Sequence, residues 1–174
     1  FKYFGIQPIV SEEEFHKKSL KDLTKLLYPE LLTLYKAHCE TNATIAYPVI
    51  KQVYEDPNNQ FERIVVPFTD GQKGLNIATD LKEAYESGGK QIIIDFEKNI
   101  SLAIIDDAWK THLRQMDELK QSVQLATHEQ KDPLLIYKLE AYNLFKDMVD
   151  RVNKEIVAFL FHAHLPQAEP AIEQ

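Results

Sequence analysis

The side chains of this sequence that could do acid–base chemistry are a pair of carboxylates and a nearby histidine. Asp106 and Asp107 are adjacent, and His112 follows within two helical turns. Two carboxylates can serve as general acid and base, but neighbouring residues of a helix point about 100° apart and cannot converge on one substrate atom. The pair therefore indicates a solvated helix face or a contact with a neighbouring domain. A small hydrolase using Asp106 or His112 is an alternative that needs a concave site, which the pattern does not supply.

Two further histidines and the single cysteine could bind a metal or act as a nucleophile. His162 and His164 are two residues apart, which puts them on different faces of a helix, and the stretch from His162 to the C-terminus is typical of a fraying tail. Cys39 falls in a helical pattern, and we expect an inert, partly packed thiol. One cysteine allows no internal disulfide, which fits a reducing compartment. We predict no metal site, and we expect His112 and His128 to be surface residues.

Motifs that would define an enzyme are missing from the sequence. It contains no GxxxxGK[ST], GxGxxG, HExxH or CxxC, and so no recognisable phosphate loop, dinucleotide site or metal motif. We therefore expect no catalytic, cofactor-binding or metal-binding residues in this chain. The formal net charge of −7 argues against a nucleic-acid binder, and charges interrupt every apolar run before it could cross a bilayer.

Helical patterns dominate the first third of the chain. Ser11 and Glu14 form a capping box before an apolar series, and Pro29 and Pro48 break or kink the pattern, which predicts two or three helices up to about Asp56. The apolar residues expected to face a core are Leu31, Leu34, Ile45, Val49, Ile50 and Val53.

A change of period after residue 60 predicts a small β-hairpin at about residues 61–78. The β-branched runs 61–68 and 75–78 are separated by a Gly-rich polar turn, and Pro67 suggests an edge strand. A short helix over 80–87 should follow, ended by Gly88 and Gly89 where a left-handed cap belongs.

The last part of the chain predicts two long helices. Residues 90–125 contain no Gly or Pro, and Asp132 followed by Pro133 is a strong signal for a helix start. The apolar residues of the first helix are Leu102, Ile105, Trp109, Leu113, Met116, Leu119 and Val123, beside a second stripe of Ile93, Phe96, Ile100 and Ile104. We expect a wide, buried face in the first half of this helix, and we expect Trp109 to anchor a core or an interface.

Two such helices joined by a short polar turn must run antiparallel, and the turn at the tip is free to touch something else. The predicted fold is mainly α with a small β-hairpin: a long antiparallel two-helix finger packed with a small helical wing subdomain.

Three linked strings of the sequence resemble the SecA family of protein-export motors. DDAWKTHLRQMDELKQSVQ, EQKDPLLIYKLEAYNLFKDMV and NKEIVAFLF contain W-K-x-H-L, M-D-x-L and Q-K-D-P elements in order. The resemblance implies a helical scaffold domain with its two-helix finger at 98–165. Residues 1–97 resemble the helical wing domain with an inserted hairpin, and 166–174 would be a tail.

This resemblance also implies a function and a set of contacts. The finger would touch the SecY channel and the translocating preprotein through His128, Glu129, Gln130 and Lys131 at its tip. Many family members have a tyrosine at the position of His128, whose ring is smaller, more polar and able to change its charge near neutral pH. The finger would face the motor domains through Trp109, Lys110, His112 and Leu113.

The implied partners are the remaining SecA domains, the SecY complex and unfolded preprotein, without nucleic acid. ATP and Mg²⁺ would belong to the motor domains of the parent protein and not to this chain. The expected location is the cytoplasm, with peripheral association with the inner membrane through the translocon. The sequence begins without an initiator Met, which favours a fragment. The alternative is a stand-alone helical protein-interaction module without enzymatic activity.

Overall fold

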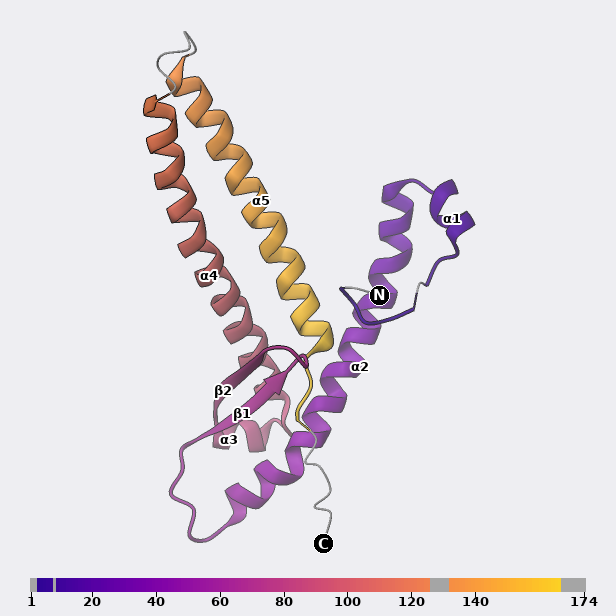
Figure 1. Ribbon diagram of the computed structural model, residues 1–174. Coiled ribbons are helices and arrows are strands. Elements are labelled where there is room, and N and C mark those ends of the chain that lie inside the picture. The colour runs from indigo at the N-terminus through magenta and orange to yellow at the C-terminus, as the bar shows by residue number, and fades with distance from the viewer. Residues whose placement is uncertain (1–2, 8, 126–131, 167–174) are drawn as a thin grey trace, which may run out of the picture. The chain divides into compact units, whose positions relative to one another are not determined.

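The computed structural model of this chain describes residues 3–7, 9–125 and 132–166. It divides into two compact units: the wing unit, Phe1–Asn99 with Ala158–Gln174, and the finger unit, Ile100–Val157. The elements are α1 (Glu12–Lys17), α2 (Leu20–Glu55), β1 (Arg63–Thr69), β2 (Gly74–Asp80), α3 (Leu81–Glu86), α4 (Lys90–Leu125) and α5 (Pro133–His162). The predicted fold class, mainly helical with one β-hairpin and two long C-terminal helices, is therefore confirmed (Figure 1).

Two side-chain caps start the N-terminal helices. The Ser11 hydroxyl accepts a hydrogen bond from the Glu14 N–H at 3.3 Å, as the capping box predicted, but α1 ends after six residues. A second cap follows at once, where the Ser19 hydroxyl accepts from the Asp22 N–H at 3.3 Å and begins α2. The apolar series that follows the capping box therefore spans two helices.

The prolines of the first region do not end a helix. Pro29 and Pro48 both lie inside α2, which Figure 1 shows as one long helix passing beside the β-hairpin. Each proline removes one backbone donor, a local cost that the surrounding hydrogen bonds and packing can offset. The buried residues along α2 are Leu23, Asn42, Ala43, Ala46 and Ile50.

The hairpin pairs β1 with β2 in antiparallel register from Arg63↔Asp80 to Thr69↔Gly74. Its turn is set by Asp70, whose Oδ1 accepts from the N–H groups of Gln72 at 2.9 Å and Lys73 at 2.7 Å. Gly71 follows Asp70 with φ +88°, a backbone conformation that side chains with a Cβ rarely adopt.

The core of the wing unit lies around three phenylalanines. The rings of Phe68 and Phe96 stack with centroids 4.3 Å apart, and Phe159 lies 6.0 Å from Phe96. These residues come from β1, α4 and α5, so aromatic packing joins three elements that are far apart in the sequence. Other fully buried side chains of this core are Ile77, Leu81, Ala84, Ile92 and Ala163.

The residues that follow α5 join the wing core as a short extended stretch, which we call the junction segment, residues 163–165. The His38 Nε2 donates to the Ala163 carbonyl at 2.7 Å, and Asn42 Nδ2 approaches the same oxygen at 3.4 Å. On the other side, Thr69 and His164 exchange two backbone hydrogen bonds of 3.0 and 2.9 Å. The junction segment is thus tied to α2 and to β1.

The finger unit consists of the stretches of α4 and α5 that run side by side in opposite directions (Figure 1). The Asp132 carboxylate accepts from the Leu134 N–H at 2.9 Å, which confirms the predicted start of α5 at Pro133. The end of α4 at Leu125 is also as predicted.

The turn between α3 and α4 depends on two glycines with positive φ. A Cβ at Gly89 (φ +88°) would lie 2.7 Å from the Ala43 carbonyl oxygen on α2, whereas a Cβ at Gly88 (φ +65°) would meet no described atom within 4 Å. The tight approach at Gly89 lets α2 pack closely against this turn.

We expect Gly89→Ala to lower the free energy of unfolding by more than about 2 kcal/mol, because backbone strain and a clash with a backbone atom add up. Gly88→Ala is the matched control and should cost about 1 kcal/mol, the conformational term alone. Urea unfolding followed by circular dichroism measures both. Equal losses in the two variants would contradict the close approach.

Candidate protein-contact surfaces

A line of large apolar side chains lies exposed along α4. We call it the finger stripe: Leu102, Ile105, Trp109 and Leu113, whose exposed fractions are 56%, 47%, 45% and 49%. Their spacing of three and four residues places them on one helix face. The second helix of the finger adds exposed apolar residues of its own: Leu134, Leu135, Leu139, Tyr142 and Phe145. Patches of this kind are typical of surfaces that pack against another protein or domain.

The buried positions of α4 in the finger unit include Ile100 and Val123, but several other strongly hydrophobic residues of this helix are exposed. Ala108 and His112 are buried, at 7% and 5% exposed, whereas Leu102 and Ile105 are not. The prediction of a wide buried face in the first half of this helix is therefore wrong for Leu102 and Ile105. A helix in a two-helix hairpin packs only one narrow side against its partner, so a second apolar stripe stays open.

His112 is an internal residue of the finger, which corrects the prediction of a surface histidine. Its ring lies between Trp109 and Phe145, with centroid distances of 5.5 and 6.0 Å. Its Nδ1 atom is buried and has no hydrogen-bond partner among the described residues. The imidazole packs beside the half-exposed indole as a flat side chain.

Trp109 also borders a small cavity between the two helices of the finger. The cavity measures about 240 Å³ and is lined by Ile105, Trp109, Met148, Val149 and Val152. Since one side of the indole packs against His112 and part of it remains exposed, Trp109 belongs partly to the seam and partly to the finger stripe.

Lys110 and the acidic pair lie on the solvated side of α4. The Lys110 ammonium donates to the Asp106 carboxylate at 2.6 Å, and this hydrogen bond raises the pKa of Lys110. The Asp107 carbonyl accepts from the Thr111 hydroxyl at 3.1 Å. Both side chains of the ion pair are mostly exposed, so the pair adds little stability. The Asp106 carboxylate therefore forms an ion pair within its own helix.

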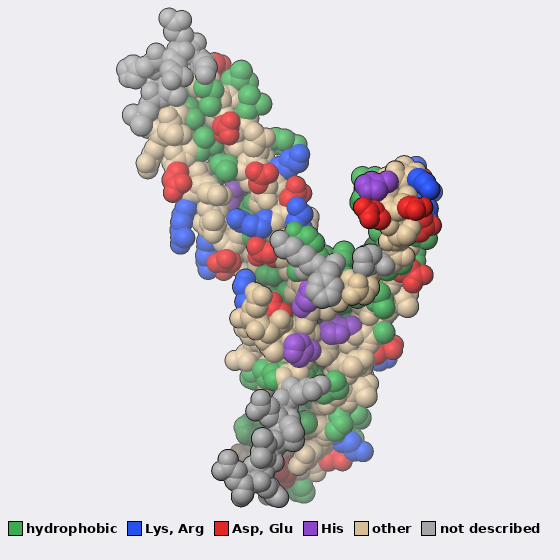
Figure 2. All heavy atoms as spheres, turned by 45° about the vertical axis from the view of Figure 1, so that its right-hand side comes forward, with side chains coloured by type: hydrophobic (Ala, Val, Ile, Leu, Met, Phe, Trp, Pro, Cys, Tyr) green, Lys and Arg blue, Asp and Glu red, His purple; other side chains and the backbone are tan. Residues whose placement is uncertain are grey.

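The histidines near the end of α5 are bound to backbone carbonyls. His162 Nδ1 donates to the Ala158 carbonyl at 2.7 Å, His164 Nδ1 lies 3.0 Å from the His162 carbonyl, and His38 Nε2 donates to Ala163. Figure 2 shows histidine side chains gathered on one face of the molecule. In the described part of the chain, no group of His, Cys, Asp and Glu could hold a metal ion. The prediction of a fraying tail is wrong for residues 162–166.

Cys39 is half-buried in the wing unit, as its pattern predicted. Burial raises the pKa of its thiol, which lowers the thiolate fraction near neutral pH. Burial also raises the pKa of Tyr35 beside it, and the Tyr35 hydroxyl donates to Glu97 at 2.7 Å. Both groups are therefore held in their neutral forms, in line with an unreactive thiol.

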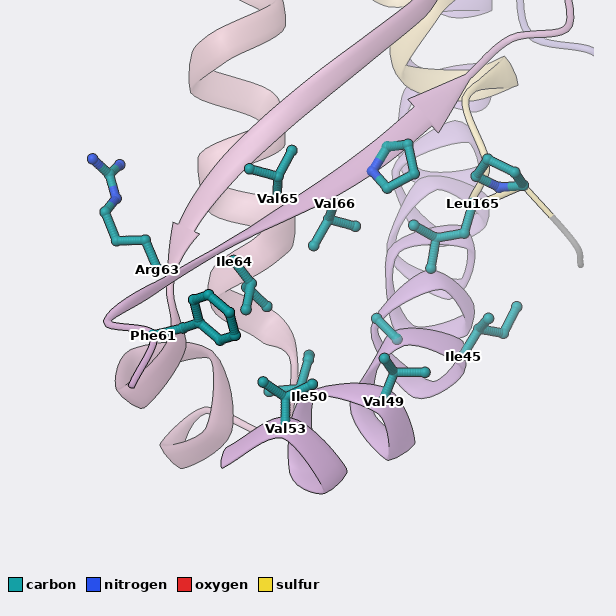
Figure 3. Close-up of a pocket in the computed structure, with 13 residues that line it drawn as sticks. Ile45, Val49, Ile50, Val53, Phe61, Arg63, Ile64, Val65, Val66 and Leu165 are labelled. Carbon is teal, nitrogen blue, oxygen red and sulfur yellow. The ribbon is translucent and has the colours of Figure 1, made fainter. Parts of the chain in front are cut away.

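A second candidate surface is an apolar groove between β1 and α2, which we call the hairpin groove (Figure 3). It measures about 510 Å³ and is apolar apart from Arg63. Ile45 and Val49 form part of its α2 wall and are 51% and 63% exposed, so the prediction that they face a core is wrong. The sequence pattern marked these residues as apolar but could not show that the described part of the chain leaves them exposed.

The other predicted contact residues stand as follows. Trp109 and His112 lie together and Leu113 is exposed beside them, while Lys110 faces solvent. The proposed tip residues, His128 to Lys131, lie outside the described residues. Among the helices that the structure describes, none is long and apolar enough to cross a membrane.

The exposure of Trp109 sets the expected effect of removing it. We expect Trp109→Ala to lower the free energy of unfolding by about 1–2 kcal/mol, less than the loss of a buried indole, because only part of the ring is packed. Urea unfolding followed by circular dichroism gives the value, and Lys110→Ala, which removes an exposed side chain next to it, should leave the midpoint unchanged. A loss above about 3 kcal/mol would mean that the indole is a full core residue.

Comparison with known proteins accounts for nearly the whole chain. The family model of the SecA wing and scaffold domain matches residues 7–164. The protein translocase subunit SecA of Flavobacterium psychrophilum is 57% identical over 99% of the chain, and that of Christiangramia forsetii is 58% identical over 98%.

The chain spans only 16% and 15% of the lengths of these two relatives. The SecA subunit of Bacteroides fragilis is 47% identical over 94% of the chain. No solved structure matches the chain with statistical significance. The hairpin-bearing helical unit, the two-helix finger and the family match agree, and this chain belongs to the SecA family as its wing and scaffold domain.

Proposed function

We propose that the finger unit contacts the SecY channel and the translocating preprotein, and that it couples ATP hydrolysis in the motor domains to movement of the polypeptide. Membership of the SecA family supports a role in a protein translocase, and the shape of the finger supports a role in contact. The two long helices are joined by a polar stretch of sequence, and such a connection is suited to contact with another molecule.

The exposed finger stripe is the observation that carries this proposal. A two-helix hairpin that leaves Leu102, Ile105, Trp109 and Leu113 about half exposed is incomplete by itself. In the parent protein, the remaining SecA domains would cover this stripe, so that Trp109 and Leu113 pack against them and Lys110 lies at the rim. His112 would act indirectly, by bracing the Trp109 ring.

The same proposal assigns the partners and the location. The chain would bind the remaining SecA domains, the SecY complex and unfolded preprotein, and it would work in the cytoplasm at the inner membrane without entering the bilayer. It would bind no ATP or Mg²⁺ itself and have no enzymatic activity, since both ligands would be bound by the motor domains. A stand-alone interaction module would use the same surfaces, but it would have no need of a motor.

The tip contact can be tested by cross-linking in a full-length SecA protein that contains this chain. With Cys39→Ala as background, His128→Cys should form adducts with a stalled precursor and with SecY. Lys17→Cys, an exposed position on α1, is the control and should form neither. The absence of both adducts at position 128, or equal yields at the two positions, would overturn the proposed contact.

The isolated chain should not respond to nucleotide. We expect millimolar Mg-ATP to leave its melting temperature unchanged, because a ligand stabilises a protein only when it binds the folded state. Differential scanning fluorimetry is the measurement, with the full-length protein as the positive control. A reproducible rise in the melting temperature of the isolated chain would contradict the assignment of nucleotide binding to the motor domains.

A further inference from the structure

The backbone of β1 has a free edge along the hairpin groove. At both ends of the hairpin the even-numbered residues bond across to β2: Leu81 N–H donates to the Glu62 carbonyl at 2.9 Å, and Asp70 N–H donates to the Lys73 carbonyl at 3.2 Å. Because antiparallel pairing alternates, the odd-numbered residues of β1 direct their N–H and C=O groups to the opposite edge. Among the described residues, nothing bonds to these groups of Arg63 and Val65.

This edge already accepts one strand residue. Thr69, the last residue of β1, exchanges two backbone hydrogen bonds with His164 as an antiparallel bridge. Pro67 comes next on the same edge, and its missing N–H falls on the side that β2 does not use. Beyond Pro67, the backbone N–H and C=O groups of Val65 and Arg63 lie along the same edge of β1. The described residues of the junction segment therefore pair with only one end of this edge.

The groove beneath this edge offers apolar walls on both sides. Figure 3 shows Ile64 and Val66 of β1 pointing toward Ile50 and Val53 on α2, while Val65 points away from them. A strand added to the edge would place every second side chain against these walls and the others toward solvent.

We propose that the hairpin groove binds an extended, apolar segment of the unfolded precursor as an antiparallel strand added to β1. The segment would form backbone hydrogen bonds with Val65 and Arg63 and place alternate apolar side chains between Val66 and Val49. The identity of the occupant rests on the proposed function. A translocase must accept many sequences, and backbone pairing over an open apolar groove depends on no particular side chain.

Two other occupants fit the edge less well. The chain beyond Pro166 has Gln167 and Glu169 at the alternate positions that would face the apolar walls, and Pro170 would lack an N–H toward β1. If a second copy of β1 paired with this edge, both strands would contain Pro67, which has no backbone N–H to donate. An incoming segment free of proline avoids both defects.

The test uses the full 174-residue chain and a fluorescein-labelled peptide of seven alternating threonines and valines, measured by fluorescence anisotropy. We expect Val65→Pro to weaken binding at least tenfold, because it removes the outward N–H without touching a bond to β2. Val65→Thr is the matched control and should bind within threefold of the original chain. N-methylation of the peptide threonines, whose N–H groups face β1, should abolish binding, whereas methylation of the valines should not.

The apolar wall is tested by a second pair of variants in case Val65→Pro fails to fold. Val49→Asp on α2 should weaken binding at least tenfold, and Ile94→Asp, an equally exposed apolar site on α4, should not. Unchanged binding in folded Val65→Pro or Val49→Asp overturns the proposal. Tenfold tighter peptide binding by a chain ending at Pro166 would make residues 167–174 the occupant and overturn it too.

A dimer that Val65→Pro converts to monomer, measured by sedimentation, would point to a second copy and would likewise overturn the proposal. These outcomes are separate from the cross-linking at position 128. If the chain did not bind the peptide but position 128 still cross-linked, the groove proposal would be wrong and the proposed finger contact would stand. If the chain bound the peptide but position 128 did not cross-link, the finger contact would be wrong and peptide binding in the groove would stand.

Discussion

The wing unit depends on the way that the junction segment is tied into it. Asn42 is 4% exposed, and its amide both approaches the Ala163 carbonyl and accepts from the Leu165 N–H at 3.4 Å. A buried amide is costly unless its polar atoms are bonded, and the backbone carbonyl of the buried Ala163 has the same need. Asn42 and the junction segment therefore satisfy each other, and together with the Thr69 bridge they fix α2, β1 and the end of α5 in one arrangement.

This arrangement also creates the hairpin groove. Within the described part of the chain, the junction segment pairs with the Thr69 end of β1 alone, and no other described residue pairs with the strand edge from Pro67 to Arg63 beside the apolar wall of α2. Two-stranded hairpins are marginal alone, and here the inward face of the hairpin is stabilised by Phe68 against Phe96. Because this face is packed, the hairpin does not need a further strand from the residues that the structure describes.

The finger unit, in contrast, leaves many of its large apolar side chains exposed. Its buried residues include Ile100, Val123 and Met148 together with the small Ala108 and the flat His112, while other large apolar residues, such as Leu102 and Leu113, stay about half exposed. Packing between two helices removes only part of the apolar surface that their sequences carry. The remainder, including Trp109, fits a domain that works within a larger protein.

Much of the architecture follows from local sequence signals. Asp132 with Pro133, Ser11 with Glu14, and the paired glycines after α3 each act over one turn of chain, so the sequence alone determined the starts of α1 and α5, the hairpin and the two-helix finger, although it did not reveal the start of α2 at Ser19. The tertiary structure decided which apolar residues are covered. Ile45 and Val49 are apolar like Ile50, and Trp109 has a large, mostly apolar ring, yet of these four residues the described part of the chain buries only Ile50. Burial depends on contacts between distant segments, such as His164 on β1 and Phe145 on His112, which periodicity along one helix cannot specify.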